Sequence, residues 1–216
     1  MAKSNEHSAP AEDVSRQSAV RCVSLWIVSH LIGAFWGLKV TGLEHLPLRG
    51  PVIIASNHVS WWDGPVVIAA AGPERYVRFL SKIELFRTPV LGWFLREVGM
   101  VPVDRAKGDV QAIRAAVQMV RRGEMLAVFP EGTRSKAGLP GRPKPGVGFL
   151  ARESGAPVIA ARVRGTERFF RFPRLEVRFG PPMRYEEPAA AASEARAGRK
   201  QCHDFAQAVM DRIFAL

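Results

Sequence analysis

The sequence predicts an α/β fold: a central, mostly parallel sheet flanked by helices, with an N-terminal hydrophobic membrane-associating helix. Two observations predict it. Short apolar runs typical of buried strands alternate with segments of helical periodicity, which is the pattern of a parallel sheet covered by helices. The chain has 216 residues, a length that suits one domain with one sizeable core.

The N-terminal region divides into a polar tail and a hydrophobic helix. Residues 1–18 are polar, show no secretory signal and are expected to be disordered. Residues 19–38 are expected to form a helix that lies in a membrane leaflet. Its apolar part, Cys22–Leu38, contains two tryptophans and is short for a span, which needs about 20 apolar residues. The alternative is that this helix packs on the core of the following domain, residues 39–216.

Seven segments are expected to form the strands of the sheet. The clearest is Pro51–Ser56, a compact apolar run that follows the turn residues Pro47 and Gly50. In chain order the expected strands are Lys39–Glu44, Pro51–Ser56, Tyr76–Leu80, Met100–Val103, Met125–Phe129, Pro157–Val163 and Leu175–Phe179.

The expected helices lie between these strands and at the C-terminus. Asp63 suits the N-cap of the first, with Pro65 in its first turn. The helical pattern of the second is interrupted by Pro89 and Gly92, whereas the third has apolar residues along one face and ends at Gly123. The expected helices are Asp63–Ala71, Glu84–Val98, Asp109–Arg122, Val147–Glu153 and an alanine-rich segment from Pro188 to Leu216.

The charge balance limits the classes of partner. Lys and Arg number 31 against 20 Asp and Glu, so the formal net charge is +11, and such a surface attracts nucleic acid, anionic membranes or phosphorylated small molecules. No helix-turn-helix, RNP or zinc motif is present, so nucleic acid is not an expected partner. The two cysteines, Cys22 and Cys202, have no metal-type or redox-type spacing, and reduced thiols are expected.

Three polar clusters follow expected strands. They are NHVSWWD (Asn57–Asp63), VDR (Val103–Arg105) and PEGTRS (Pro130–Ser135). In a parallel sheet the carboxyl ends of the strands meet at one edge, where active sites are built. The clusters are therefore expected to form one site.

His58 and Asp63 suit a general base and its orienting carboxylate. A neutral imidazole can deprotonate a hydroxyl when a carboxylate bonds its other ring nitrogen. No GxSxG nucleophile motif is present, so the simplest mechanism is direct attack of that hydroxyl on an activated acyl group. The alternatives are a structural histidine beside an N-cap aspartate, or a metal site. For a metal site the spacing of further ligands is missing, and no metal is expected.

PEGTRS and nearby cations suit a phosphorylated ligand. Arg134 can grip a phosphate, Gly132 permits close approach, and Glu131 can accept a hydrogen bond from a polyol. The alternative is a surface turn with a solvated ion pair. Lys82 and Arg105 each follow a strand and could join a basic cup with Lys144, although single cations at strand ends are more often simply solvated.

Taken together, these segments resemble the glycerolipid acyltransferase family, of the bacterial 1-acyl-sn-glycerol-3-phosphate acyltransferase type. Four blocks match in order, over about Val40 to Thr166. They are NHVSWWD, the stretch from Lys82 to Arg105, FPEGTRS (Phe129–Ser135) and APVI (Ala156–Ile159). The chain departs from the family at Val101-Pro102-Val103 and at Ala160, and these departures leave the acceptor open.

The resemblance implies a reaction and a set of site residues. His58 is the base and Asp63 orients it; the acceptor hydroxyl attacks the thioester of acyl-CoA or acyl carrier protein, and no cofactor is required. Transfer to the sn-2 hydroxyl of 1-acylglycerol 3-phosphate gives phosphatidic acid in phospholipid biosynthesis. The glycerol phosphate is expected on these residues: Lys82, Arg105, Glu131, Gly132, Thr133 and Arg134.

Other functions remain open on the sequence. The acceptor could instead be glycerol 3-phosphate, another lysophospholipid, a lyso-ornithine lipid or a glycolipid. A hydrolase that uses His58 to activate water fits the same local chemistry, and a non-catalytic module for anionic lipid fits the charge. The expected partners are the two substrates and an anionic membrane surface. The expected location is the cytoplasmic face of the cell membrane, with monotopic or peripheral attachment.

Overall fold

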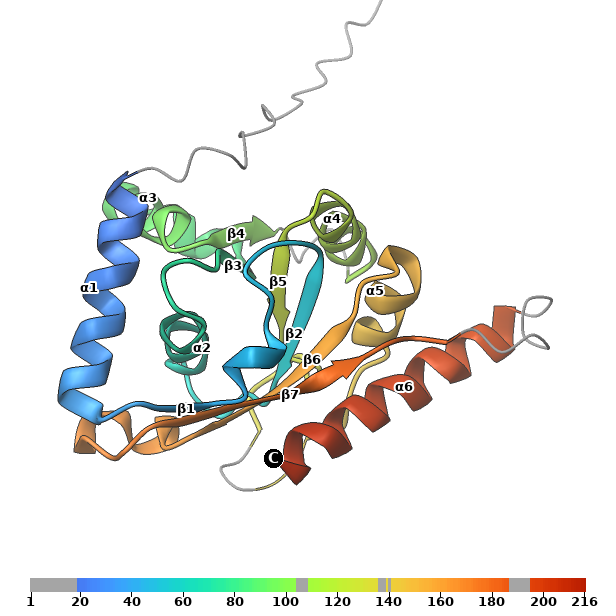
Figure 1. Ribbon diagram of the computed structural model, residues 1–216. Helices are drawn as coiled ribbons and strands as arrows, with labels where there is room; N and C mark the ends of the chain where they lie inside the picture. Colours follow the sequence, from blue (N-terminus) through green and yellow to red (C-terminus); the bar gives the residue numbers. More distant parts are fainter. Residues whose placement is uncertain (1–18, 104–108, 136–138, 140, 187–194) are drawn as a thin grey trace, which may run out of the picture.

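A single sheet runs through the computed structural model, which describes residues 19–103, 109–135, 139, 141–186 and 195–216 (Figure 1). The strand order is β1-β7-β6-β2-β5-β3-β4. Neighbouring strands are parallel except β6 and β7, so β1 and β7 run opposite to the other five. The expected mostly parallel sheet is confirmed. The strands are β1 Lys39–Thr41, β2 Val52–Ser56, β3 Val77–Lys82, β4 Met100–Val103, β5 Met125–Val128, β6 Val158–Arg164 and β7 Glu176–Met183.

Helices cover both faces of the sheet. α1 and α2 lie on one face, with α3 beside α1, and α4, α5 and α6 lie on the other (Figure 1). The α-helices are α1 Ala19–Trp36, α2 Asp63–Ala71, α3 Pro89–Glu97, α4 Asp109–Arg121, α5 Gly146–Ser154 and α6 Ala195–Ala215. The described part of the chain also contains short 3₁₀ helices, which the sequence pattern does not predict: η1 Leu43–His45, η2 Ile83–Phe86 and η4 Thr166–Arg171.

Two hydrophobic layers enclose the central strand, β2. Val52 and Ile54 pack toward α1 and α2, whereas Ile53 and Ala55 pack toward α4, α5 and α6. Successive strand residues point to opposite faces, and a strand covered on both faces is therefore apolar throughout. This explains why Pro51–Ser56 reads as a continuous apolar run, and it makes β2 a rigid base for the loop that follows.

Helix α1 has one buried side and one exposed side. Leu25 and Ile32 are buried against the domain, and the helix packs mainly on α2. Its other side exposes large apolar side chains, namely Val23, Trp26, Ile27, Leu31 and Phe35. Within the described residues, no helix is both long and apolar enough to cross a bilayer. Attachment of α1 to a leaflet stays a prediction, and the expected tail at residues 1–18 lies outside the described residues.

The region around Pro89 differs from the prediction. Instead of interrupting a long helix, Pro89 begins α3, where its missing N–H costs nothing and Thr88 precedes it as the N-cap residue. Gly92 lies against η2, and a Cβ there would come within 2.6 Å of the Phe86 carbonyl oxygen. The glycine is therefore needed for close packing of η2 on α3, a contact that helical periodicity does not report.

Candidate active site

The candidate residues gather at the carboxyl edge of the five co-directional strands. His58 follows β2, Lys82 ends β3, and Glu131 follows β5. Thr166, which the sequence reasoning did not single out, follows β6 at the same edge. Arg105, expected after β4, lies outside the described residues.

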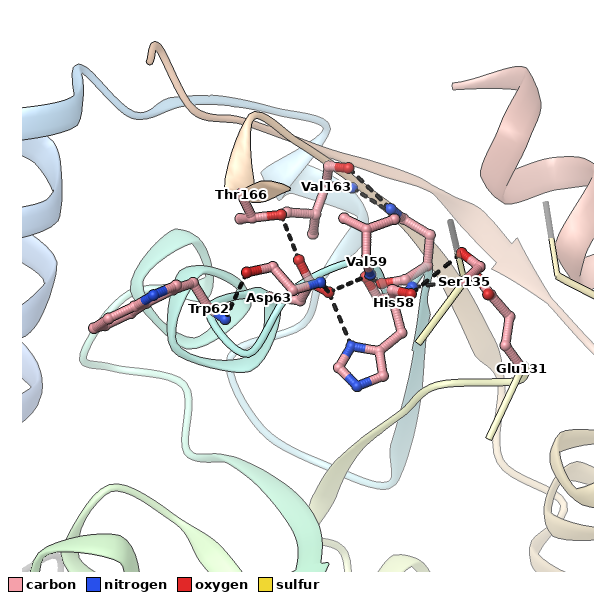
Figure 2. A network of polar contacts seen from close by, with 11 residues as sticks. His58, Val59, Trp62, Asp63, Glu131, Ser135, Val163 and Thr166 are labelled. Atoms are coloured by element: carbon pink, nitrogen blue, oxygen red, sulfur yellow. Dashed lines mark hydrogen bonds and ion pairs between the residues drawn. The ribbon is translucent and has the colours of Figure 1, made fainter. Parts of the chain in front are cut away.

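His58 and Asp63 form a hydrogen-bonded pair (Figure 2). His58 Nδ1 lies 2.9 Å from Asp63 Oδ2, and the same oxygen accepts the N–H groups of Val59 at 2.7 Å and Ser60 at 2.8 Å. Asp63 Oδ1 accepts the hydroxyl of Thr166 at 2.5 Å. A carboxylate that accepts from all its partners requires the imidazole proton on Nδ1. The lone pair of His58 is then on Nε2, where a base needs it.

The role expected of Asp63 as an N-cap is wrong. Trp62 occupies the N-cap position, and Asp63 is the first residue of α2. Among the described residues, the bonds to the Asp63 carboxylate come from the preceding loop and from Thr166. The carboxylate turns back to the preceding loop, because that loop offers it two N–H groups and the imidazole. Asp63 is fully buried, so these bonds replace the water it has lost.

The imidazole ring is held from a second side. Phe129 stacks on it, with ring centroids 3.9 Å apart and an interplanar angle of 11°. The side chain of His58 remains 19% exposed, which leaves the ring accessible. Asn57 fixes the backbone before it: its amide donates to the Val163 carbonyl oxygen at 3.0 Å and accepts the Val163 N–H at 2.8 Å. The sequence pattern indicates no role for Phe129 or Asn57.

The PEGTRS turn is attached to the histidine loop. The His58 carbonyl oxygen accepts the N–H and the hydroxyl of Ser135, at 2.8 and 3.3 Å. Glu131 Oε1 accepts the His58 N–H at 3.3 Å (Figure 2). Glu131 is only 4% exposed, and its Oε2 is buried without a hydrogen-bond partner among the described residues. The geometry of Glu131 therefore supports holding the loop, and contact with a polyol stays a prediction.

A partly buried cation lies near Glu131. The guanidinium of Arg162, on β6, stacks over the Phe214 ring of α6 at 3.8 Å. Burial lowers the pKa of Arg162, the positive charge of Arg164 lowers it further, and the carboxylate of Glu131 opposes both effects. Arg162 thus supplies part of the positive charge that accompanies a buried Glu131.

The predicted phosphate ligands lie at the rim of the site. Arg134 is exposed, and its guanidinium stacks over the Trp61 ring at 4.4 Å. Lys82 and Thr133 are also exposed. Gly132 has a left-handed backbone, with φ of 70°, and a Cβ there would lie 3.0 Å from the side chain of Lys144. The exposed side chains are accessible from solvent, and their contact with a phosphate stays a prediction.

Comparison with known proteins gives consistent results. The sequence profile described as Acyltransferase matches residues 37–164. The chain is 34% identical over 145 residues to the 1-acyl-sn-glycerol-3-phosphate acyltransferase BAT2 of Brassica napus, covering 66% of this chain and 41% of that protein. It is 29% identical over 164 residues to the 1-acyl-sn-glycerol-3-phosphate acyltransferase of Bacillus subtilis, covering 74% and 80% of the two chains.

Two further similarities bear on acceptor and fold. The lyso-ornithine lipid O-acyltransferase of Pseudomonas aeruginosa is 34% identical over 128 residues, which cover 57% of this chain and 45% of that protein. The crystal structure of the LPA acyltransferase PlsC from Thermotoga maritima superposes with a TM-score of 0.63 at 22% identity, over 90% of this chain and 81% of that one. At that identity the superposition supports the fold alone. The matched region spans less than half of the plant protein and of the Pseudomonas protein.

Proposed function

The chain belongs to the Acyltransferase family, and on this premise we propose that it acylates the sn-2 hydroxyl of 1-acylglycerol 3-phosphate from acyl-CoA or acyl carrier protein. The product is phosphatidic acid. The observation that carries the proposal is the pair in which Asp63 Oδ2 lies 2.9 Å from Nδ1 of His58. This contact leaves Nε2 without a proton and facing away from the carboxylate.

The reaction proceeds by direct transfer. His58 Nε2 takes the proton of the acceptor hydroxyl while the hydroxyl oxygen attacks the thioester carbonyl carbon. Asp63 stabilises the imidazolium that forms. The tetrahedral intermediate collapses, the C–S bond breaks, and the imidazolium returns its proton to the leaving thiolate. The products are an oxygen ester and a free thiol.

The acceptor phosphate is assigned to the cations at the rim. Arg134 is exposed on the loop that follows β5, and Lys82 is exposed at the last residue of β3. Arg105 is assigned to the same group from the family pattern. The turn at Gly132 and Thr133 lets a phosphate approach the backbone. Stacking on Trp61 restricts the orientation of the Arg134 guanidinium, which favours a planar, bidentate grip on phosphate oxygens.

The acyl chains are assigned to a bilayer surface. Exposed apolar residues on α1, α3 and the segment at 166–172 form what we call the apolar face, and α3 and this segment lie beside opposite ends of α1 (Figure 1). Its most exposed members outside α1 are Val90, Trp93, Phe170 and Phe172. An exposed apolar patch suits a membrane surface, and the formal net charge of +11 suits anionic lipid. We infer peripheral or monotopic attachment at the cytoplasmic face of the membrane.

The test is thiol release by the purified chain, with acyl-CoA and acyl carrier protein thioesters compared as donors. Lysophosphatidate is expected to be acylated, with phosphatidic acid identified by mass spectrometry. His58→Ala is expected to remove nearly all turnover, while His203→Ala, an exposed histidine on α6, retains it. Turnover by a folded His58→Ala variant would refute the mechanism. Free fatty acid released without acceptor would indicate a hydrolase, and vesicle binding without thiol release a lipid-binding module.

A second acceptor is favoured by one observation. The relative named lyso-ornithine lipid O-acyltransferase and the plant relative named 1-acyl-sn-glycerol-3-phosphate acyltransferase are both 34% identical to this chain over their matched regions. An acceptor panel of lysophosphatidate, lyso-ornithine lipid and glycerol 3-phosphate separates the candidates. A kcat/KM for lyso-ornithine lipid above that for lysophosphatidate would replace the first proposal with the second.

A further inference from the structure

The carboxylate of Asp63 has one partner from a distant part of the chain. Thr166, at the start of η4, is 1% exposed, and its hydroxyl donates to Asp63 Oδ1. The two residues are 103 positions apart in the sequence. Among the described residues, no other hydrogen bond reaches Oδ1, whereas Oδ2 accepts from the imidazole and from two backbone N–H groups.

We propose that Thr166 is a positioning residue for acyl transfer, which acts on His58 through Asp63. The proposal rests on the function proposed above. The three bonds to Oδ2 hold one oxygen of the carboxylate. The bond from Thr166 holds the other, Oδ1, so the carboxyl group is anchored at both oxygens and its plane is fixed more tightly than by the bonds to Oδ2 alone. The plane of the carboxylate, the direction of the Nδ1–H bond and the direction of His58 Nε2 are then set together.

An aromatic stack holds the hydroxyl in place. Phe169, three residues after Thr166, lies between two tryptophan rings: Trp62 at 4.0 Å with an interplanar angle of 6°, and Trp36 at 4.2 Å with an angle of 23°. Trp36 also donates its indole N–H to the Phe169 carbonyl oxygen at 2.7 Å.

The stack and the hydrogen bond join the same two segments. Trp62 immediately precedes Asp63, and Phe169 belongs to the same short helix as Thr166, so η4 contacts the start of α2 at two points. The end of α1 covers the stack through Trp36. Because η4 is held at both points, the Thr166 hydroxyl has a fixed position and can set the direction of the Asp63 carboxylate, which a mobile hydroxyl could not do.

The experiment compares three variants of the full chain. Thr166→Val keeps the shape and removes the hydroxyl, Thr166→Ser keeps the hydroxyl, and Thr41→Val changes an exposed threonine on β1 as the matched control. We expect Thr166→Val to lower kcat about tenfold to a hundredfold, the range for a misplaced catalytic group. The KM values for donor and acceptor should change by less than about twofold, because the direction of His58 Nε2 matters for proton transfer in the transition state rather than for substrate binding. Thr166→Ser and Thr41→Val are expected to retain the kcat of the unaltered chain.

Two results would overturn the proposal. One is a folded Thr166→Val variant with unaltered kcat. The other is a Thr166→Ser variant as slow as Thr166→Val, since shape rather than the hydroxyl would then matter. If Thr166→Val does not fold, the smaller Thr166→Ala makes the same comparison.

A measurement without substrate separates this inference from the proposed function. In ¹⁵N-histidine NMR spectra, the Nδ1–H resonance of His58 should be protected in the unaltered chain and in Thr166→Ser. It should be shifted or exchange-broadened in Thr166→Val. An identical resonance in all three would overturn the role of Thr166. Absence of turnover with every acceptor would instead refute the proposed function and leave this result standing.

Discussion

Asp63→Asn and Asp63→Ala should separate two tasks of one buried carboxylate. In the proposed mechanism Asp63 stabilises the imidazolium of His58. In the structure it also accepts the N–H groups of Val59 and Ser60 and the hydroxyl of Thr166. Asparagine keeps one oxygen for the two backbone donors but loses the charge. Alanine loses both. The two variants should therefore be similarly inactive and differ in stability.

The magnitudes follow from the contacts. For Asp63→Asn we expect kcat to fall about a thousandfold to ten-thousandfold, as for the aspartate of other His–Asp pairs. Two charge-assisted bonds become neutral ones, a loss of about 1 kcal/mol each in the free energy of unfolding. For Asp63→Ala, the free energy of unfolding should fall by about 1 kcal/mol for each of the half-buried N–H groups of Val59 and Ser60 that loses its acceptor. The buried hydroxyl of Thr166 adds about 1–3 kcal/mol, which gives a total of about 3–5 kcal/mol.

The assay combines thiol-release kinetics with urea unfolding followed by tryptophan fluorescence. Asp204→Asn, on the exposed side of α6, is the matched control and should behave as the unaltered chain. If Asp63→Asn retained more than about a tenth of kcat, the carboxylate would not be stabilising the imidazolium. If Asp63→Ala unfolded at the same urea concentration as Asp63→Asn, the hydrogen bonds from Asp63 to the N–H groups of the loop would not contribute to the free energy of unfolding.

Three further predictions concern the rim, the packing and the apolar face. Trp61→Ala removes the ring under Arg134 and should raise the KM for a phosphorylated acceptor about twofold to fivefold, the effect of an exposed cation–π contact, with little change in kcat. An unchanged KM would show that the stacking does not orient the cation. Gly92→Ala should lower the free energy of unfolding by about 1–3 kcal/mol because of the clash with η2. The control Gly33→Ala, in an open position on α1, should raise the free energy of unfolding by up to about 1 kcal/mol. The urea midpoints of the two variants measure these changes. Equal midpoints would contradict the close approach of η2 to Gly92. Trp93→Ser should weaken flotation with vesicles of anionic phospholipid without altering the unfolding midpoint, and unaltered flotation would exclude α3 from the membrane contact.

Much of the candidate site was predictable because strand ends can be recognised locally. The apolar run before Asn57 and the one before Pro130 end where polar residues begin, and a parallel sheet brings such ends together. Strand boundaries were predicted to within a few residues for the same reason. The exception is β7, which extends to Met183 through two prolines near the end of the strand.

The supporting contacts could not be predicted, because they join segments distant in sequence. Thr166 lies after β6, and its meeting with Asp63 depends on β6 pairing beside β2. Phe129 reads as the last apolar residue of a strand, yet it stacks on His58 because β5 is the other neighbour of β2. The antiparallel direction of β7 beside β6 is likewise not indicated by any local sequence pattern.

The sequence by itself determined the α/β class, the order of strands and helices along the chain, and the polar clusters at the ends of strands. These properties follow from periodicity and from residue chemistry, which are local. The tertiary structure decided how Asp63 is used. Helix-capping rules place its carboxylate on α2, whereas packing places it toward the loop, the imidazole and Thr166. The physical reason is that a fully buried carboxylate must find enough donors to replace water, and only the pairing of β2 with β6 brings the loop donors and Thr166 within reach of the same carboxylate.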